Sequence, residues 1–258
     1  MNTVQFQRKV LRALSQCAFL SEKLIGIPKS RYYCPTCSQN VFSWQPLVRD
    51  IGDGHSKLEK SPRICPHCKS LERTRLFSLY LAKYRILETQ LDILHFAPEK
   101  GLESIFRAAN IKGYLTTDLF MPNVDKVEDI TKMSFPDNAF DLIYCSNVLE
   151  HIEDDKAAMS ELYRILRPGG QAIIQVPIIG ETTYEDPNIR SETERYKHFG
   201  QGDHVRVYGT DIEERLTSAG FDVSPFDILD ELDLTEFEKD RMNIKRHELI
   251  HRCLKQSK

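Results

Sequence analysis

Between Ile93 and Pro177 the chain reads Ile93-Leu-His-Phe-Ala-Pro-Glu, then Tyr114-Leu-Thr-Thr-Asp118, then Phe140-Asp-Leu-Ile-Tyr-Cys-Ser-Asn147, and finally Gln171-Ala-Ile-Ile-Gln-Val-Pro177. Each of these runs is short and largely apolar, and helical patterns lie between several of them. Such alternation indicates βαβ units and a parallel sheet. Polar residues follow the runs, and the carboxyl ends of parallel strands meet at the crevice where ligands bind. The stretch therefore predicts an α/β fold with a ligand site along one edge of its sheet.

The same pattern extends over the remainder of the chain and predicts seven strands with helices on both faces of the sheet. The strands are expected at 91–96, 113–118, 125–129, 140–146, 171–177, 221–228 and 246–254, and helices at 100–110, 154–166 and 209–219. Asp154 and Asp155 suit a helix N-terminus, and Pro168-Gly169 is a typical stop signal. The segment 181–208 shows no strong periodicity, so we expect strand and loop there.

Four segments follow from the order of these patterns. An amphipathic helix is expected over 1–30, a cysteine-bounded module over 31–70, a connecting helix over 71–90, and the α/β domain over 91–258. Basic residues interrupt the apolar residues of 1–30, so this helix is expected to be retained and not cleaved as a signal peptide. No apolar run approaches the ~20 residues that span a bilayer, which predicts a cytoplasmic protein without membrane insertion.

Charge is distributed unevenly between the two ends of the 258-residue chain. Its formal net charge is −3, but residues 1–85 carry 15 Lys and Arg against 5 Asp and Glu. A basic segment on an acidic body can bind phosphates, including RNA or an anionic substrate. A solvated basic face without a ligand explains the same charge. No pattern indicates the oligomeric state.

Two C-x2-C motifs, Cys34-Pro-Thr-Cys37 and Cys65-Pro-His-Cys68, are separated by 27 residues. Each motif places two thiolates at one bend, and two such bends complete a tetrahedral Zn²⁺ site. Four protein ligands leave no open position, so the zinc is expected to be structural. Disulfides and free thiols are the alternatives, and disulfides are disfavoured in a cytosolic protein.

The order of strands and acidic residues resembles the class I S-adenosylmethionine (SAM)-dependent methyltransferases, which have a seven-stranded Rossmann-like sheet. The loop His95-Phe-Ala-Pro-Glu99 resembles a subgroup of them with zinc knuckles ahead of a His-x-Ala-Pro-Glu sequence. The resemblance places His95 at the family's acidic position, and Ala97, Glu99 and Gly101 at its three glycines. It also implies that Glu99 supplies the carboxylate that faces the methionine ammonium of SAM.

Further cofactor residues follow from the resemblance at the ends of the next strands. Asp118, followed by Leu119, is expected to accept hydrogen bonds from the ribose hydroxyls. Asp129 and Ile130 resemble the pair that meets the adenine, through its amine and its ring. Ser146 and Asn147 are expected to border cofactor and substrate. The alternatives are a cap for a following turn at Asp118 and an ordinary acidic turn at Asp129.

The candidate catalytic residues lie after the fourth and fifth strands. Segment 183–208 resembles a substrate lid and offers His204 as a general base, with Arg206 as a substrate clamp and His198 and Tyr208 nearby. A polar hairpin without chemistry is the alternative. His151 is a second candidate base, or a structural residue below the cofactor. Related O-methyltransferases hold a divalent ion with Glu-x-x-Glu-His, but Asn147 replaces the first Glu here.

Together these features predict methyl transfer from SAM to an oxygen or nitrogen atom of a small-molecule or saccharide-like acceptor. A histidine near neutral pH suits removal of the acceptor's proton. Two other functions fit parts of the sequence. The cysteine module could deliver RNA to a base methyltransferase, or the fold could serve as a non-catalytic interaction protein.

Overall fold

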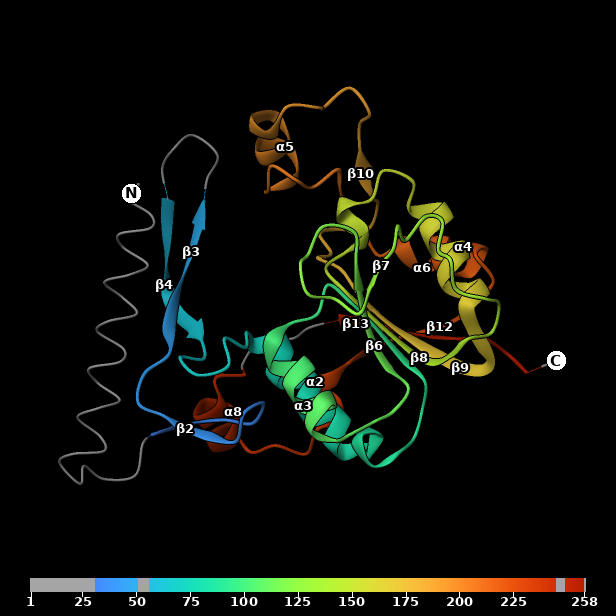
Figure 1. Ribbon diagram of the computed structural model, residues 1–258. Coiled ribbons are helices and arrows are strands. Elements are labelled where there is room, and N and C mark those ends of the chain that lie inside the picture. Colours follow the sequence, from blue (N-terminus) through green and yellow to red (C-terminus); the bar gives the residue numbers. More distant parts are fainter. Residues whose placement is uncertain (1–30, 51–55, 245–248, 258) are drawn as a thin grey trace. The chain divides into compact units, whose positions relative to one another are not determined.

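The computed structural model describes residues 31–50, 56–244 and 249–257, drawn in colour in Figure 1, so the helix expected over 1–30 lies outside the described residues. The chain forms two compact units. The sheet unit comprises Leu87–Pro98, Phe106–Glu231 and the chain from Glu248 onward; the knuckle unit comprises the chain up to Ile86 together with Glu99–Ile105 and Leu232–His247. Two segments of the knuckle unit are therefore distant in sequence from its cysteines.

The sheet unit is built on the predicted seven-stranded sheet, which the structure confirms. Its strand order is β12 (Asp222–Asp227), β13 (Leu249–Leu254), β9 (Leu166–Gln175), β8 (Phe140–Ser146), β5 (Ile93–Phe96), β6 (Tyr114–Asp118) and β7 (Lys126–Val127). The five strands from β9 to β7 run parallel, whereas β13 is antiparallel to both of its neighbours. This is the Rossmann-like fold of class I methyltransferases.

The helices of the sheet unit are short. In chain order they are α3 (Lys100–Ala108, whose first turns belong to the knuckle unit), η2 (Leu149–His151), α4 (Asp155–Ile165), α5 (Glu192–Phe199), α6 (Ile212–Ser218) and α7 (Ile228–Glu231). A two-stranded hairpin pairs β10 (Tyr184–Glu185) with β11 (Arg206–Val207). The predicted start of α4 is confirmed, because the Asp154 side chain accepts a hydrogen bond from the Ala157 amide.

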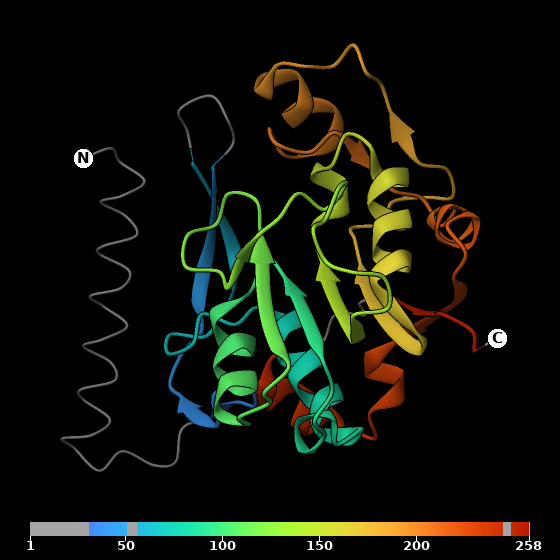
Figure 2. The same ribbon diagram turned by 45° about the vertical axis from the view of Figure 1, so that its right-hand side comes forward.

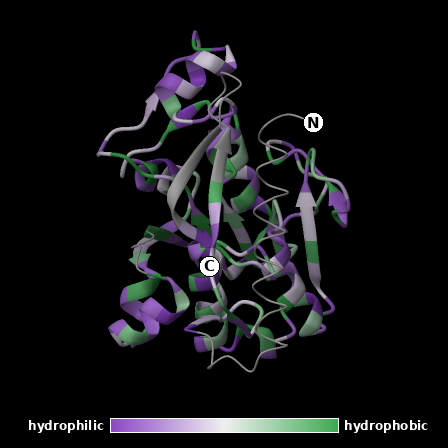
Figure 3. Ribbon diagram, turned by 90° about the vertical axis from the view of Figure 1, so that its left-hand side faces the viewer, coloured by the Kyte–Doolittle hydropathy of each residue, from purple (hydrophilic) through white to green (hydrophobic). Residues whose placement is uncertain are grey.

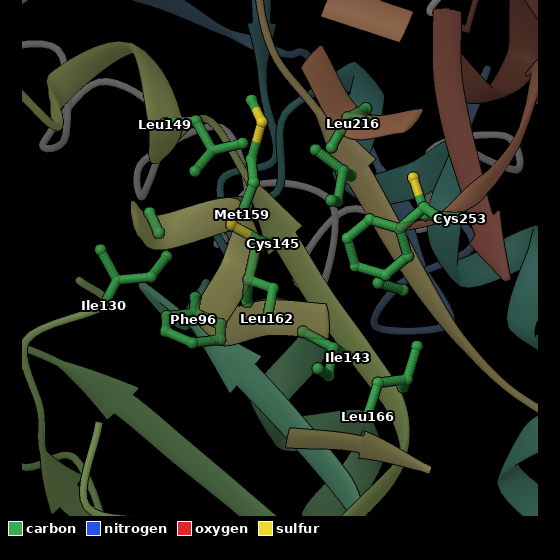
Figure 4. Close-up of a cluster of buried hydrophobic side chains, with 14 of the residues drawn as sticks. Phe96, Ile130, Ile143, Cys145, Leu149, Met159, Leu162, Leu166, Leu216 and Cys253 are labelled. Carbon is green, nitrogen blue, oxygen red and sulfur yellow. The ribbon is translucent and has the colours of Figure 1, made fainter. Parts of the chain in front are cut away.

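One continuous core joins α4 and α6 to the same face of the sheet. Figure 4 shows Met159 and Leu162 of α4 against Ile143 and Cys145 of β8, with Leu216 of α6 beside them. Figures 1 and 2 show both helices next to β8 and β9. Because β8 is almost completely buried, its apolar residues do not alternate with polar ones, as is usual for a central parallel strand.

Two predictions for this unit were wrong: the start of one strand and the absence of a helix from segment 181–208. The strand expected from Gln171 begins at Leu166 and runs through Pro168-Gly169-Gly170, because Gly169 donates to the Lys255 carbonyl and Gly170 accepts from the Lys255 amide. The segment expected to hold only strand and loop contains α5. This helix is mostly hydrophilic, as its purple colour in Figure 3 shows, so it lacks an apolar stripe that periodicity can detect.

The knuckle unit holds two hairpins and two helices. Strand β1 (Tyr32–Cys34) pairs with β2 (Gln39–Val41), and β3 (Gln45–Asp50) pairs with β4 (Ser56–Ile64). Helix α2 (Glu72–Lys83) follows, and α8 (Glu236–Met242) from late in the chain contacts β1. The division between the two units falls within the short helix η1 (Ile86–Glu88). Among the described residues of both units, no helix is long and apolar enough to cross a membrane.

Candidate functional site

The candidate ligand site is the carboxyl edge of the parallel strands in the sheet unit. From β5 the chain proceeds to β6 and β7 on one side, and then returns to β8 and β9 on the other. In such sheets the ligand crevice lies where the strand order reverses, here between β5 and β8. The residues that follow these two strands, Ala97 and Asn147, have φ angles of 45° and 55°. Left-handed backbone is uncommon for residues other than glycine, and strained residues often lie at ligand sites.

Asp118 ends β6 at this edge, and its carboxylate is held by the backbone. Its Oδ1 accepts hydrogen bonds of 2.7 Å from both the Phe120 and the Met121 amides. Leu119 is 45% exposed and Phe120 is 89% exposed, so apolar surface lies beside the carboxylate. A carboxylate fixed through one oxygen can still accept hydroxyls through the other. The geometry thus includes the cap that was considered for Asp118.

Asp129 and Ile130 have different environments although they are adjacent. Asp129 is exposed, and its Oδ1 accepts from the Thr131 amide and hydroxyl, which lowers the pKa of the Asp129 carboxyl. Ile130 is 5% exposed and packs in the main core. The surface that Ile130 offers to an adenine ring is therefore small.

His95 and Ser146 point away from solvent. His95 is fully buried, its Nδ1 lies 2.8 Å from the Tyr114 hydroxyl, and its ring meets Tyr144 edge-on at 5.2 Å. Ser146 donates to the Gln175 side chain at 3.1 Å. The structure thus places His95 in the core of the sheet instead of at its edge, because the β5 strand is buried at every position.

Glu99 and Gly101 belong to the knuckle unit. Glu99 Oε1 lies 3.8 Å from Arg73 Nε of α2. A Cβ placed on Gly101 would lie 2.8 Å from the Thr36 methyl carbon and 3.6 Å from Cys68 Sγ. Gly101 therefore packs directly against the cysteine motifs, a role that the sequence did not reveal.

The four cysteines of the two motifs converge on one point. One ligand atom from each of Cys34, Cys37, Cys65 and Cys68 lies within 4.8 Å of the others, and the Cys34–Cys68 and Cys37–Cys65 sulfurs are 3.7 and 3.8 Å apart. A tetrahedral ion with Zn–S bonds of about 2.3 Å would separate its sulfurs by about 3.8 Å. All four cysteines are unpaired thiols, so the donor set and spacing fit a zinc ion and not disulfides.

A buried cation lies next to this cluster. Arg75 of α2 is fully buried and donates to the carbonyls of Arg63, Ser70 and Asn243 at 3.0, 3.0 and 2.8 Å. Its guanidinium stacks on Trp44 at 4.2 Å. Burial lowers the pKa of Arg75, and the nearby thiolate charges oppose that effect. Four thiolates around a dication would carry a net charge of −2, and the Arg75 guanidinium is placed to offset part of it.

A second cluster of metal-type ligands lies after β8. Glu150, His151 and His204 each offer one ligand atom within 4.8 Å of the others. The two imidazole rings meet edge-on with centroids 4.7 Å apart. Glu150 and His204 are 1% and 5% exposed, whereas the His151 side chain is 30% exposed. We call these three residues the Glu-His-His cluster.

Arg206 and Tyr208, which were expected to face a substrate, lie in a buried network instead. Arg206 Nε donates to Glu185 at 2.7 Å, and its terminal nitrogens donate to the carbonyls of Leu149, Ile152 and Glu153. Burial raises the pKa of Tyr208, whose hydroxyl donates to Asp155 at 2.7 Å. We call Arg206, Arg215, Asp155, Glu185 and Tyr208 the Arg206 network.

Opposite charges balance within the Arg206 network. Arg215 bridges Asp155 at 3.0 Å and Glu185 at 2.8 Å. Burial acts to raise the pKa of Glu185, but Arg215 and Arg206 together hold it below its ordinary value. The network fastens the β10–β11 hairpin to the start of α4. His198 lies apart from it in α5, with its Nδ1 2.9 Å from the Tyr184 hydroxyl.

Comparisons with known proteins agree with this fold. Residues 121–174 match the family profile described as a methyltransferase domain. Phosphoethanolamine N-methyltransferase 3 of Arabidopsis thaliana is 43% identical over 49 residues, which are 19% of this chain and 10% of that protein. The ubiquinone/menaquinone biosynthesis C-methyltransferase UbiE of Hydrogenovibrio crunogenus is 36% identical over 61 residues, 23% of this chain and 24% of that protein.

A solved structure has the same fold over a larger part of the chain. A candidate sarcosine dimethylglycine methyltransferase from Galdieria sulphuraria aligns with a TM-score of 0.50 at 14% identity, over 82% of this chain and 92% of that one. The chain spans only about a tenth to a quarter of the length of the curated relatives named above. This protein thus has the fold of the class I SAM-dependent methyltransferases, and its residues 121–174 are similar to the methyltransferase-domain family.

Proposed function

We propose that this protein transfers a methyl group from SAM to an oxygen or nitrogen atom of a small-molecule or saccharide-like acceptor. The observation that carries the proposal is the carboxyl edge between β5 and β8, where left-handed Ala97 and Asn147 flank the reversal of strand order and Asp118 ends the adjacent strand. The methyltransferase-domain match covers the chain from just after Asp118 to β9. The fold and the residues at the carboxyl edge of the sheet therefore both support SAM as the ligand.

The chain's own residues bind and position the cofactor in this proposal. Asp118 accepts the ribose hydroxyls, and Leu119 and Phe120 offer exposed apolar surface beside them. The turn at Ala97 takes the backbone course that glycine takes in the family, so that main-chain atoms approach the cofactor. When bound, SAM supplies an electrophilic methyl group on a sulfonium. Catalysis then consists mainly of holding the acceptor atom in line with that methyl group.

The acceptor end of the edge is marked by the Glu-His-His cluster. Its first two residues follow β8 directly in η2, and the cluster lies in the same unit as Asp118. An oxygen or nitrogen acceptor loses a proton during methylation, and imidazole or carboxylate groups can take part in that loss. Arg206 and Tyr208 are held within their own network, so we no longer assign them to substrate.

Asp118→Ala is expected to weaken SAM binding by about 2–3 kcal/mol, or about 30–150-fold in Kd, because a pair of charge-assisted hydrogen bonds is lost. Isothermal titration calorimetry measures this change. Asp222→Ala is a matched control, since Asp222 is an exposed carboxylate of β12 that accepts a hydrogen bond from the Gln256 side chain at 3.2 Å. Equal affinities for wild type and Asp118→Ala would place the ribose elsewhere, and absence of SAM binding in the wild type would refute the function.

The acceptor class is tested with SAM carrying a labelled methyl group. Transfer of the label to a small-molecule fraction of a cell extract is the expected result. Transfer to RNA instead would favour the base-methyltransferase function, and binding of SAM without any transfer would favour a non-catalytic role.

The four cysteines hold one structural zinc ion in this proposal. Their sulfur spacing fits a tetrahedral ion, Ser70 lies 3.3 Å from Cys34 Sγ and 3.2 Å from Cys68 Sγ, and Arg75 supplies compensating charge. A hydroxyl so close to two thiolates can stabilise their charge by hydrogen bonding. The zinc then orders the small β1–β2 hairpin, which has little core of its own.

Gly101→Ala is expected to destabilise the knuckle unit by about 1–3 kcal/mol, the usual cost of overpacking, because its new methyl group would meet the Thr36 methyl carbon. Thr36→Ser removes that carbon but keeps the hydroxyl, which lies 3.1 Å from Ser78 Oγ. The double variant is therefore expected to regain most of the loss in denaturant unfolding. An equal loss in the single and double variants would contradict the packing of Gly101 on Thr36.

A further inference from the structure

We propose that Glu150, His151 and His204 bind one divalent transition-metal cation, at a site separate from the four cysteines. Their three ligand atoms lie within 4.8 Å of one another. All three residues belong to the sheet unit, and they come from two segments, η2 and the chain just before β11. A carboxylate with two imidazoles is a donor set that suits Mn²⁺, Fe²⁺, Co²⁺ or Zn²⁺.

This site differs from the cysteine site in the number of coordination positions that the protein leaves open on the metal. Four thiolates close the coordination sphere of a tetrahedral ion, whereas three ligands leave at least one position for water or another molecule. The His151 side chain is 30% exposed, which gives solvent and small molecules a route to that position. Burial of Glu150 and His204 keeps the other side of the site dry.

Asp203 orients the first of the two imidazoles. Its Oδ2 lies 3.4 Å from His151 Nδ1, and its backbone carbonyl oxygen lies 3.3 Å from the same nitrogen. A histidine that binds a metal commonly donates its other ring N–H to a carboxylate or carbonyl, which fixes the tautomer and the ring orientation. Nδ1–H directed at Asp203 leaves the Nε2 lone pair of His151 for a cation.

Gln201 contacts the second imidazole, that of His204, as Asp203 contacts the first. Its side-chain amide contacts His204 Nε2, and the oxygen and nitrogen of such an amide are assigned only by their hydrogen bonds. With the amide oxygen at this contact, His204 donates its Nε2–H to Gln201, so that Nδ1 is the ring nitrogen that would bind a cation. Each imidazole thus has a side-chain neighbour that can fix its tautomer.

The two segments that carry the ligands are fixed to one another by the backbone. The Val205 amide donates to the Glu150 carbonyl at 2.9 Å. Arg206, the next residue, donates to the carbonyls of Leu149 and Ile152 on either side of the two η2 ligands. A site whose ligands are held by such supporting bonds pays less ordering entropy when a metal binds.

The function of the cation rests on the proposed methyl transfer. An acceptor hydroxyl at its open position would lose a proton to solvent more readily, because a metal lowers the pKa of a bound hydroxyl. That oxygen then forms the bond to the methyl carbon. The carbon–sulfur bond breaks with its electron pair on sulfur, so that the products are a methyl ether and the neutral thioether.

The test uses the full chain with zinc in the cysteine site, titrated with Co²⁺ and followed by calorimetry and visible absorption. We expect about one further Co²⁺ per chain, with ligand-field bands and no thiolate-to-cobalt charge transfer. His151→Ala should weaken Co²⁺ binding by about 100-fold or more, and Asp203→Ala by about 10–100-fold. Asp203 is 71% exposed, so its replacement leaves the fold intact.

His198→Ala is the matched control, because this exposed histidine lies in α5 beside Tyr184 and should leave Co²⁺ affinity unchanged. The site is refuted if zinc-loaded wild type binds no Co²⁺ at millimolar concentration, or if His151→Ala and Asp203→Ala both bind it as the wild type does. SAM titration without cobalt separates the two proposals. Cobalt binding without SAM binding overturns only the methyl transfer, and the reverse overturns only the cation site.

Discussion

Cys34→Ser is expected to abolish zinc binding and to unfold the β1–β2 hairpin and the cysteine motifs around it. Structural zinc contributes about 10–16 kcal/mol of apparent binding free energy in small zinc modules, far more than the cluster of Cys34, Val41, Trp44 and Cys65 can supply alone. Without the ion, three thiols and a buried guanidinium would remain around one point. Loss of metal and loss of folding should therefore occur together.

The single tryptophan of the chain makes this loss measurable. Trp44 is 6% exposed and lies under the Arg75 guanidinium, so unfolding of the module should shift its fluorescence toward that of a solvated indole. Metal analysis should find one zinc per wild-type chain and none in Cys34→Ser. Cys145→Ala is the control, since Cys145 is a buried cysteine of β8 in the other unit. A wild-type chain purified without chelator that lacks zinc would rule out the metal.

Arg206→Met is expected to lower the free energy of unfolding by about 3–5 kcal/mol, because removal of one member of a buried ion pair leaves the other charges uncompensated. The Arg206 and Asp155 side chains are each 5% exposed. Methionine keeps much of the side-chain volume, so the loss reports charge and hydrogen bonds more than packing. Urea unfolding followed by far-UV circular dichroism measures it.

Arg190→Met is the matched control for Arg206, since Arg190 is exposed and donates to the Pro187 carbonyl. Its replacement should change the free energy of unfolding by no more than about 0.5 kcal/mol. If Arg206→Met were as stable as this control while catalysis failed, Arg206 would contact the substrate after all. That outcome would restore the role first predicted for it.

The strands were predictable because each is a short apolar run bounded by polar residues. β5, β6 and β8 lie within one or two residues of their expected bounds, since apolar runs this short, bounded by polar residues, favour buried strands over helices. Helices α5 and α8 are polar, and periodicity missed them. A different signal was present in the Ser-x-x-Glu and Thr-x-x-Glu sequences that begin at Ser191 and Thr235. Thr235 and Glu238 form a capping box at the start of α8, and the Ser191 hydroxyl accepts a hydrogen bond from the Glu194 amide at the start of α5.

The candidate site was predictable only in part. The convergence of four cysteines followed from spacing alone, since a C-x2-C motif already forms half of a zinc site. The density of polar residues near β11 gave no such guidance. His204 joins Glu150 and His151, while Arg206, two residues later, points into a buried network. Sequence composition does not distinguish charges that neutralise each other from charges that await a ligand.

Residues late in the sequence complete both units, and this order has a consequence for biosynthesis. Asn243, just after α8, accepts a bond from Arg75 through its carbonyl and donates its side-chain amide to Pro62, and β13 enters the sheet between β12 and β9. On a ribosome, the cysteine motifs emerge long before Asn243, and all five parallel strands are synthesised before β13, which pairs with β9. Neither unit can complete its native contacts until these late residues are released, so the nascent chain exposes sheet edge for most of its synthesis. A ribosome stalled before Asn243 should therefore carry a chain that chaperones bind and proteases cut readily.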